Sequence, residues 1–278
     1  MDALVTTEWL ADELGAADLV VLDAGFTSTV PGAPPREPRR EFEAGHIPSA
    51  RFLDLDTLSD RANPLPTMLP AAEQLAARMR SLGVNDHSRI LLYDDNSLHS
   101  AARAWWVLHA YGTPNVAILD GGLAKWKAEG RPLERGTHLV GQGSFTVRHP
   151  AQGVRTLAGM KTLTGTQIVD ARSPARFAGH EPERAGVTPG HIPNSRNLHY
   201  ADFFHPDGTW KRDITLRAVF EGEGVEIEHP IVATCGSGVT AAVVVFAAHL
   251  LGHKADLYDG SWAEWGADPD TPKATGAA

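Results

Sequence analysis

The 278-residue chain contains a single cysteine, Cys235. One cysteine cannot form an internal disulfide and cannot build a zinc site of the cysteine-rich kind. A chain of this length folds without such crosslinks, because it can bury a large core. Scarcity of disulfides is typical of a reducing compartment, so we expect a cytoplasmic location.

Long apolar runs and an excess of basic residues are also missing. The longest apolar run, residues 241–248, falls far short of the roughly 20 residues that a membrane helix needs. The first eight residues, MDALVTTE, show no basic segment followed by an apolar leader. The 34 acidic residues outnumber the 25 Lys and Arg residues, giving a formal net charge of −9. We therefore expect neither a membrane nor a nucleic acid as partner.

Three sequence blocks occur twice in the same order, which predicts a duplicated domain. Residues 20–24, 45–51 and 119–126 return as residues 167–171, 190–196 and 258–265. A polar segment with glycine and proline separates the two copies and has no clear periodicity. We place the domains at residues 1–135 and 156–278, joined by a linker at residues 136–155.

Each copy alternates short apolar runs with helical patterns. The apolar runs are typical of buried parallel strands and cover residues 19–22, 90–93 and 116–119, then 168–169, 231–234 and 255–257. Helical periodicity covers residues 71–82 and 100–111, and a glycine follows each segment. The alternation predicts the α/β class, with one open, mainly parallel sheet flanked by helices in each domain.

The repeated Gly-His-Ile-Pro segment contains His46 and His191. Glycine and proline favour a turn there, and each histidine is interpreted as satisfying nearby backbone groups rather than as a catalytic residue. The thirteen histidines of the chain show no pattern that we interpret as a metal site. The sequence indicates neither a metal nor another cofactor.

Cys235 lies between an apolar strand at residues 231–234 and an apolar helix that begins near residue 241. Ligands bind at the carboxyl ends of strands in open α/β sheets. The loop after the cysteine contains Gly236, Ser237, Gly238, Val239 and Thr240. Its amides and the positive end of the helix can form an anion cradle around the sulfur, which favours the thiolate. The alternative interpretation is a buried, inert cysteine.

Two phosphate-binding interpretations of this loop fail on single residues. A nucleotide-binding P-loop requires Gly-Lys-Ser/Thr, which does not follow. A cysteine phosphatase needs an arginine six residues after the cysteine, and Ala241 occupies that position. Without a guanidinium, the phosphate oxygens lose their bidentate partner.

The duplicated α/β architecture and the cysteine loop resemble the two-domain rhodanese superfamily of sulfurtransferases. The resemblance extends from about residue 4 to residue 265 and includes residues 39–43, 59–61, 68–70, 103–106 and 235–241. It implies that Cys235 carries a persulfide during turnover. The loop is more similar to the mercaptopyruvate-using type, because Gly236 and Ser237 stand where thiosulfate-preferring members usually have basic residues.

The first copy has no cysteine at the corresponding position. Aligning residues 90–94 with residues 231–235 places Asp94 opposite Cys235. We therefore expect the N-terminal domain to be non-catalytic and to shape a substrate cleft between the domains. The resemblance implies catalytic roles for Ser237 in the loop and for Asp56 of the N-terminal domain.

Two arginines match positions that bind the substrate carboxylate in the family. Arg176 and Arg184 can each hold a 2-oxo acid bidentately, which presents the substrate sulfur to Cys235. The alternative is that they pair with Glu181 and Glu183 at the surface. One position departs from the pattern: Thr67 replaces a histidine of a proposed proton relay.

The resemblance implies a sulfurtransferase that moves sulfur from 3-mercaptopyruvate to cyanide, a small thiol or a thioredoxin-like protein and releases pyruvate. Thiosulfate is the alternative donor. A non-catalytic sulfur carrier or protein-binding module is the alternative of another class.

Overall fold

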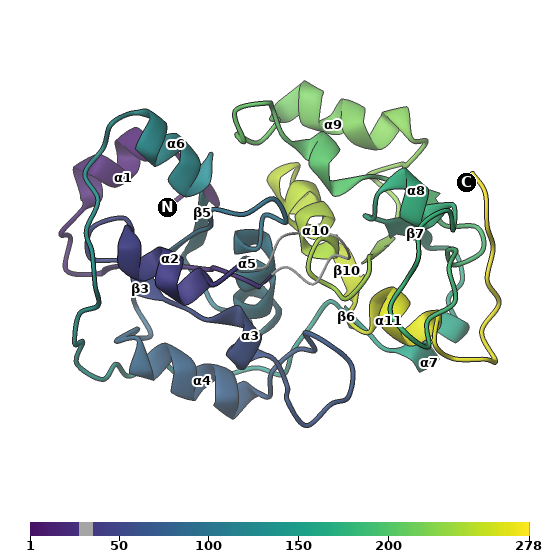
Figure 1. The fold of residues 1–278 in the computed structure, drawn as a ribbon, viewed down its shortest axis with the longest axis horizontal. Helices are drawn as coiled ribbons and strands as arrows, with labels where there is room; N and C mark the ends of the chain where they lie inside the picture. The colour runs from purple at the N-terminus through teal and green to yellow at the C-terminus, as the bar shows by residue number, and fades with distance from the viewer. Residues whose placement is uncertain (28–35, 278) are drawn as a thin grey trace.

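The computed structural model describes residues 1–27 and 36–277. The described chain forms two halves that lie side by side, each built on one five-stranded parallel sheet (Figure 1). This confirms the predicted α/β class with a parallel sheet in each copy.

Among its described residues, 1–27 and 36–135, the first half contains five strands and six helices. The strands are β1 (Leu4–Val5), β2 (Leu19–Asp23), β3 (Arg51–Phe52), β4 (Arg89–Tyr93) and β5 (Val116–Leu119), arranged in the order β1-β5-β4-β2-β3. The helices are α1 (Thr7–Glu13), α2 (Pro38–Ala44), α3 (Leu55–Leu58), α4 (Ala72–Ser81), α5 (Ala101–Ala110) and α6 (Gly122–Ala128).

The second half repeats this arrangement. Its strands are β6 (Val154–Arg155), β7 (Gln167–Asp170), β8 (Arg196–Asn197), β9 (Ile231–Thr234) and β10 (Ala255–Tyr258), in the order β6-β10-β9-β7-β8. Its helices are α7 (Leu157–Lys161), α8 (Pro174–Phe177), the 3₁₀ helix η1 (Tyr200–Phe203), α9 (Asp213–Gly222), α10 (Ala241–Leu250) and α11 (Ser261–Trp265). The two strand orders correspond one to one, so β4 is the counterpart of β9.

The helices α4 and α5 form where the sequence predicts them, each one residue shorter at both ends than the predicted segment. Gly112 follows α5 with a φ of 70°, a left-handed conformation that glycine adopts without strain. None of the helices in residues 1–27 and 36–277 is long and apolar enough to cross a bilayer.

The two halves share one core, which α5 and α10 form by packing against each other (Figure 1). Trp105 of α5 meets Phe246 of α10 with ring centroids 4.8 Å apart. Burial of both helices explains why their sequences are apolar over almost the whole circumference. The carboxyl ends of β4 and β9 therefore lead into a shared interface.

The segment between the halves follows the surface of the first half. The Gly143 amide donates to the Arg80 carbonyl at 2.8 Å, and the Gln152 amide donates to the Ala110 carbonyl at 2.8 Å. Strand β6 begins at Val154, inside the stretch that the sequence assigns to the linker.

Candidate active site

Cys235 is the first residue after β9 and lies six residues before α10. Its side chain is buried within the shared core. The cysteine thus lies at the carboxyl edge of the second sheet, next to the first half, where open α/β folds bind their ligands.

The first two carbonyl groups of the cysteine loop point toward α11. The Trp262 amide donates to the Cys235 carbonyl at 2.9 Å, and the Ala263 amide donates to the Gly236 carbonyl at the same distance. The amide that follows each carbonyl in the same peptide plane points the opposite way. The amides of Gly236 and Ser237 therefore point away from α11.

The next two carbonyl groups point toward the first half. The Thr67 hydroxyl donates to the Ser237 carbonyl, and the Arg103 guanidinium donates to the Gly238 carbonyl at 3.2 Å. The Gly238 amide is thereby turned inward and donates to the Cys235 Sγ at 3.1 Å. One loop amide thus faces the sulfur, which suits a sulfur anion, and a cradle formed by the whole loop stays a prediction.

Arg103 is fixed by a buried ion pair across the interface. It donates to the Asp259 carboxylate at 2.9 Å, and both side chains are about 5% exposed or less. The second carboxylate oxygen of Asp259 accepts a hydrogen bond from the Leu69 amide at 2.7 Å. Neither Arg103 nor Asp259 was predicted from the sequence to take part in the site, although Asp259 belongs to the repeated block at residues 258–265. The first half thus supports the loop through Arg103 and Thr67.

Both glycines of the loop have close neighbours. A Cβ at Gly238, where φ is 79°, would lie 3.0 Å from an Arg103 nitrogen. A Cβ at Gly236 would lie 3.1 Å from an Arg176 nitrogen. The loop therefore needs glycine at 238 for its backbone conformation and has little room at 236.

The predicted site residues largely meet in one cavity of about 110 Å³. Its walls contain Cys235, Gly236, Ser237, Val239 and Thr240 of the loop, the predicted binding residues Arg176 and Arg184, and the further residues Phe26, Leu98, Arg172, Ser173, His199 and Tyr200. Phe26 and Leu98 come from the first half, so both halves line the cavity.

The arginines of the cavity belong to a network of charges. Arg176 pairs with Glu183 at 2.6 Å, and Glu183 also pairs with Arg172 at 2.9 Å. Arg172 in turn pairs with Asp170 at 2.6 Å, with both side chains buried. Arg184 also lines the cavity, close enough to Arg176 and Glu183 for their charges to act on its pKa. Arg172 and Asp170 were not predicted from the sequence. The sequence indicated Glu183 as an alternative partner of Arg176, and the structure shows that pair, largely buried rather than at the surface.

Electrostatic effects connect this network to the sulfur. Burial and the neighbouring Arg176 lower the pKa of Arg184, while Cys235 and Glu183 act in the opposite direction. Burial also raises the pKa of Tyr200, and the charge of Cys235 adds to that rise. Arg184 and Tyr200 therefore both lie close enough to sense charge on the sulfur.

Asp56 is not among the described residues that line the Cys235 cavity. It is an exposed residue of α3, and its carboxylate accepts a hydrogen bond from the Thr27 amide at 3.1 Å. The structure thus does not bring Asp56 to the sulfur, and its catalytic role stays a prediction.

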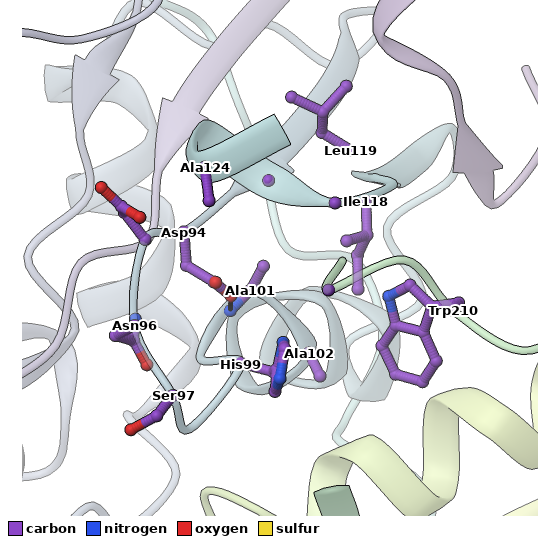
Figure 2. Close-up of a pocket in the computed structure, with 14 residues that line it drawn as sticks. Asp94, Asn96, Ser97, His99, Ala101, Ala102, Ile118, Leu119, Ala124 and Trp210 are labelled. Carbon is purple, nitrogen blue, oxygen red and sulfur yellow. Dashed lines mark hydrogen bonds between the residues drawn. The ribbon is translucent and has the colours of Figure 1, made fainter. Parts of the chain in front are cut away.

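The first half has a pocket of about 220 Å³ at the position that corresponds to the cysteine site. Asp94 is the first residue after β4, as Cys235 is after β9. Its carboxylate points to the start of α5 and accepts a hydrogen bond from the Ala101 amide at 2.6 Å (Figure 2). Burial raises the pKa of Asp94 to about 6.

The two histidines of the Gly-His-Ile-Pro repeat are buried in equivalent ways. The Nδ1 of His46 lies 2.8 Å from the Phe42 carbonyl oxygen, and that of His191 lies 2.9 Å from the Phe177 carbonyl oxygen. Each ring also stacks on the same phenylalanine. Both therefore satisfy backbone groups at a turn, as interpreted from the sequence.

Comparison with known proteins agrees with this geometry. The sequence-family model of the rhodanese-like domain matches residues 6–129 and 154–268 of this chain. The 3-mercaptopyruvate sulfurtransferase of Escherichia coli (strain K12) is 40% identical over 96% of this chain and 96% of its own. The human 3-mercaptopyruvate sulfurtransferase is 40% identical over 95% of this chain and 91% of its own.

Among solved structures, the crystal structure of SseA from Escherichia coli, one of the 3-mercaptopyruvate sulfotransferases, superposes with a TM-score of 0.85. The identity is 38%, and the match covers 94% of this chain and 99% of SseA. The chain therefore belongs to the rhodanese-like family and is a sulfurtransferase that contains two copies of the rhodanese-like domain.

Proposed function

We propose that the protein transfers sulfur from 3-mercaptopyruvate to a thiophilic acceptor through a persulfide on Cys235. The observation that carries this proposal is that a cysteine whose sulfur accepts a hydrogen bond from a loop amide meets two arginines in one cavity. The amide suits a sulfur anion, and the arginines suit the carboxylate of a 2-oxo acid.

In the first step, the Cys235 thiolate attacks the sulfur of 3-mercaptopyruvate. A sulfur–sulfur bond forms, the carbon–sulfur bond breaks, and its electron pair leaves with the organic fragment as the enolate of pyruvate. Protonation of the enolate carbon yields pyruvate, and the outer sulfur stays on Cys235. The loop amides, with the Ser237 hydroxyl, stabilise negative charge on the sulfur atoms.

In the second step, the acceptor attacks the outer sulfur and restores the Cys235 thiolate. Cyanide, a small thiol or a reduced thioredoxin-like protein fits this chemistry, because each is a nucleophile toward sulfur. We place this reaction in the cytoplasm, where a lone reactive thiol stays reduced.

The uncharged cysteine loop supports 3-mercaptopyruvate over thiosulfate as donor. Gly236 and Ser237 line the cavity and carry no charge, and a cysteine loop without basic residues suits a carbonyl-containing thiol better than a dianion. Thiosulfate is the alternative donor, since a loop that starts at the cysteine is common to both types of the family, although its residues differ.

For the domain organisation, we propose an N-terminal domain at residues 1–135, a linker at 136–155 and a catalytic domain at 156–278. Asp94 leaves the first domain without a nucleophile. The hydrogen bonds that Thr67 and Arg103 donate to the cysteine loop support a scaffolding role for this domain. We also retain Asp56 as a candidate catalytic residue.

The proposal is tested by comparing kcat/KM for 3-mercaptopyruvate and thiosulfate with cyanide as acceptor. We expect a higher kcat/KM with 3-mercaptopyruvate and no turnover by the Cys235→Ser variant. A preference for thiosulfate would contradict the donor assignment and leave the transferase chemistry intact. Turnover by Cys235→Ser would contradict the persulfide.

A further inference from the structure

A buried histidine far from the cysteine loop has an unused ring nitrogen. The Nδ1 of His46 lies 2.8 Å from the Phe42 carbonyl oxygen and must carry the proton, because a carbonyl can only accept. The Nε2 of His46 is buried and has no hydrogen-bond partner within residues 1–27 and 36–277. In the neutral ring this nitrogen presents its lone pair to whatever lies in front of it.

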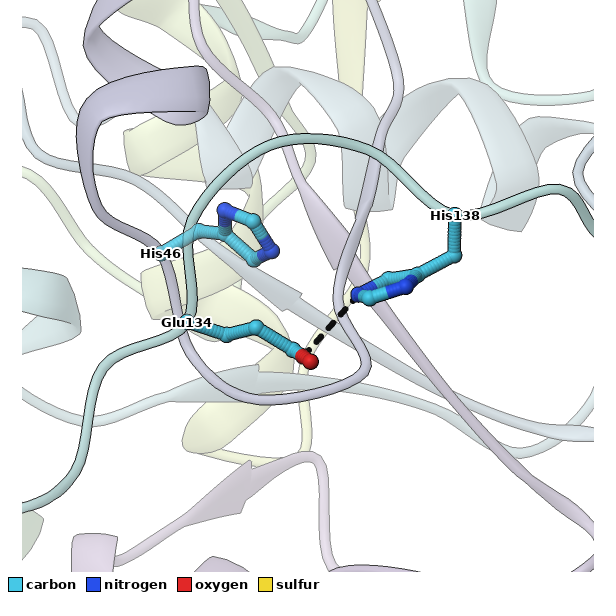
Figure 3. Close-up of side chains that lie close together, drawn as sticks. All are labelled: His46, Glu134 and His138. Carbon is cyan, nitrogen blue, oxygen red and sulfur yellow. Dashed lines mark ion pairs between the residues drawn. The ribbon is translucent and has the colours of Figure 1, made fainter.

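Two further metal-ligand side chains lie in front of that nitrogen. Glu134 forms a two-way backbone bridge with His46, and His138 lies four residues further along the non-helical segment that follows α6. An Nε2 of His138 lies 3.0 Å from a Glu134 carboxylate oxygen. One ligand atom from each of His46, Glu134 and His138 falls within 4.8 Å of the other two (Figure 3).

This donor set has the chemistry of a zinc site. Two imidazole nitrogens and one carboxylate oxygen are common zinc ligands, with a fourth position left for water. Ligands about 2.0–2.2 Å from zinc in a tetrahedron lie roughly 3.3–3.5 Å apart. The three atoms lie within 4.8 Å of one another, so binding needs them to approach by at most about 1.5 Å. His138 is partly exposed, so its side chain can make this adjustment.

The supporting contacts already orient two of the ligands. The Phe42 carbonyl fixes the His46 tautomer, and stacking on the Phe42 ring at 3.9 Å fixes the plane of the imidazole. The Ser49 amide donates to the Glu134 carboxylate at 2.8 Å. Metal-binding histidines and carboxylates are usually held by such second contacts.

The duplicated half provides an internal comparison. His191 has the same bond to a phenylalanine carbonyl and the same ring stacking, but its backbone bridge is formed with Ala274. The turn therefore forms without a carboxylate in that place. Glu134 and His138 are additions that the fold itself does not require.

We propose that His46, Glu134 and His138 bind one divalent first-row transition-metal ion, with Zn²⁺ as the ion that this donor set suits best. Bound metal would join the start of the inter-domain segment to the end of α2. We expect the ion to stabilise the first half, because it would tie the fully buried His46 to the segment that follows α6.

The test uses the full-length protein with Cys235→Ser as background, which removes the chain's only thiol from competition. We expect the background protein to bind one Co²⁺ with visible d–d bands, and Zn²⁺ to displace it and raise the Tm. His138→Ala and Glu134→Gln should each weaken Zn²⁺ binding at least tenfold. Both side chains are partly exposed, so the variants should fold.

The matched control is His229→Ala. His229 and Glu226 form an exposed pair at 2.7 Å, and the pair belongs to no group of three metal ligands among the described residues. His229→Ala should bind Zn²⁺ as tightly as the background protein. Equal affinity in His138→Ala, or no Tm rise with Zn²⁺ in the background protein, would overturn the proposal. A loss of affinity in His229→Ala equal to that in His138→Ala would do the same.

Discussion

The Arg103 guanidinium, on a helix of the half that has no cysteine, lies 3.2 Å from the Gly238 carbonyl oxygen in the cysteine loop of the other half. The same side chain pairs with Asp259 beneath that loop. The first half thus acts on the reactive loop through its backbone, and its own nucleophile position is occupied by Asp94.

Replacing Arg103 tests this support. Arg103→Ala leaves the Asp259 carboxylate buried without its partner, and we expect the free energy of unfolding to fall by about 3–5 kcal/mol in denaturant titrations. The control is Arg148→Ala, which breaks a pair with Asp86 in which the arginine is 65% exposed, and which should cost far less stability than Arg103→Ala. Equal losses in the two variants would contradict the buried role of Arg103.

Arg176 is predicted to bind the donor carboxylate. Arg176→Ala removes a charge-assisted contact worth about 1.5–3 kcal/mol, so KM for 3-mercaptopyruvate should rise roughly 10- to 150-fold while kcat changes less. Glu183 keeps its bond to Arg172, so the variant should fold. Steady-state kinetics measure the effect, with Arg155→Ala as control, since Arg155 pairs with Asp256 outside the cavity. An unchanged KM in Arg176→Ala would refute the binding role.

Gly238 is predicted to be essential for the shape of the loop. Its φ of 79° disfavours a side chain by about 1–2 kcal/mol, and a Cβ would also press on Arg103 at 3.0 Å. Gly238→Ala should therefore lower both stability and kcat. Gly252 offers a matched control, because its φ is 81° and a Cβ there would meet nothing within 4 Å. Gly252→Ala should lose stability and keep its kcat, and equal kcat losses would exclude a specific role for the loop shape.

The raised pKa of Asp94 predicts that the stability of the protein depends on pH. Its pKa is about 6 in the folded protein and 3.8 ordinarily, so the unfolded chain loses the proton first. Stability should therefore fall as the pH rises from about 4 to 6, by up to about 3 kcal/mol from this group. Asp94→Asn removes this loss and should gain stability relative to the wild type over that range. Denaturant titrations measure the free energy of unfolding of both proteins over this pH range. The same pH dependence in the two proteins would contradict the assignment of the effect to Asp94.

The sequence was informative where the determinants are local. Apolar runs predicted β5 and β9 at their observed bounds, and the repeated blocks predicted the duplicated sheet. Glycines after Cys235 predicted a loop whose amides can turn toward the sulfur, and the Gly238 amide does so at 3.1 Å.

Contacts between distant segments were not predictable in this way. Thr67 and Arg103 reach the loop from positions more than 130 residues earlier, and no local pattern pairs them with Ser237 or Gly238. The Thr67 hydroxyl donates a hydrogen bond to the Ser237 carbonyl. The sequence showed only that Thr67 replaces a histidine of the family and did not predict this contact. In the same way, the cluster of His46 with Glu134 arises from a backbone bridge that only the fold creates.

The most direct test of the central claim is the intact mass of the protein after incubation with 3-mercaptopyruvate and no acceptor. We predict that the wild type gains about 32 Da, the mass of one sulfur atom, and that cyanide removes it. Cys235→Ser should gain nothing under the same conditions. A wild-type mass that stays unchanged while pyruvate is released, or a gain of sulfur by Cys235→Ser, would contradict transfer through a Cys235 persulfide.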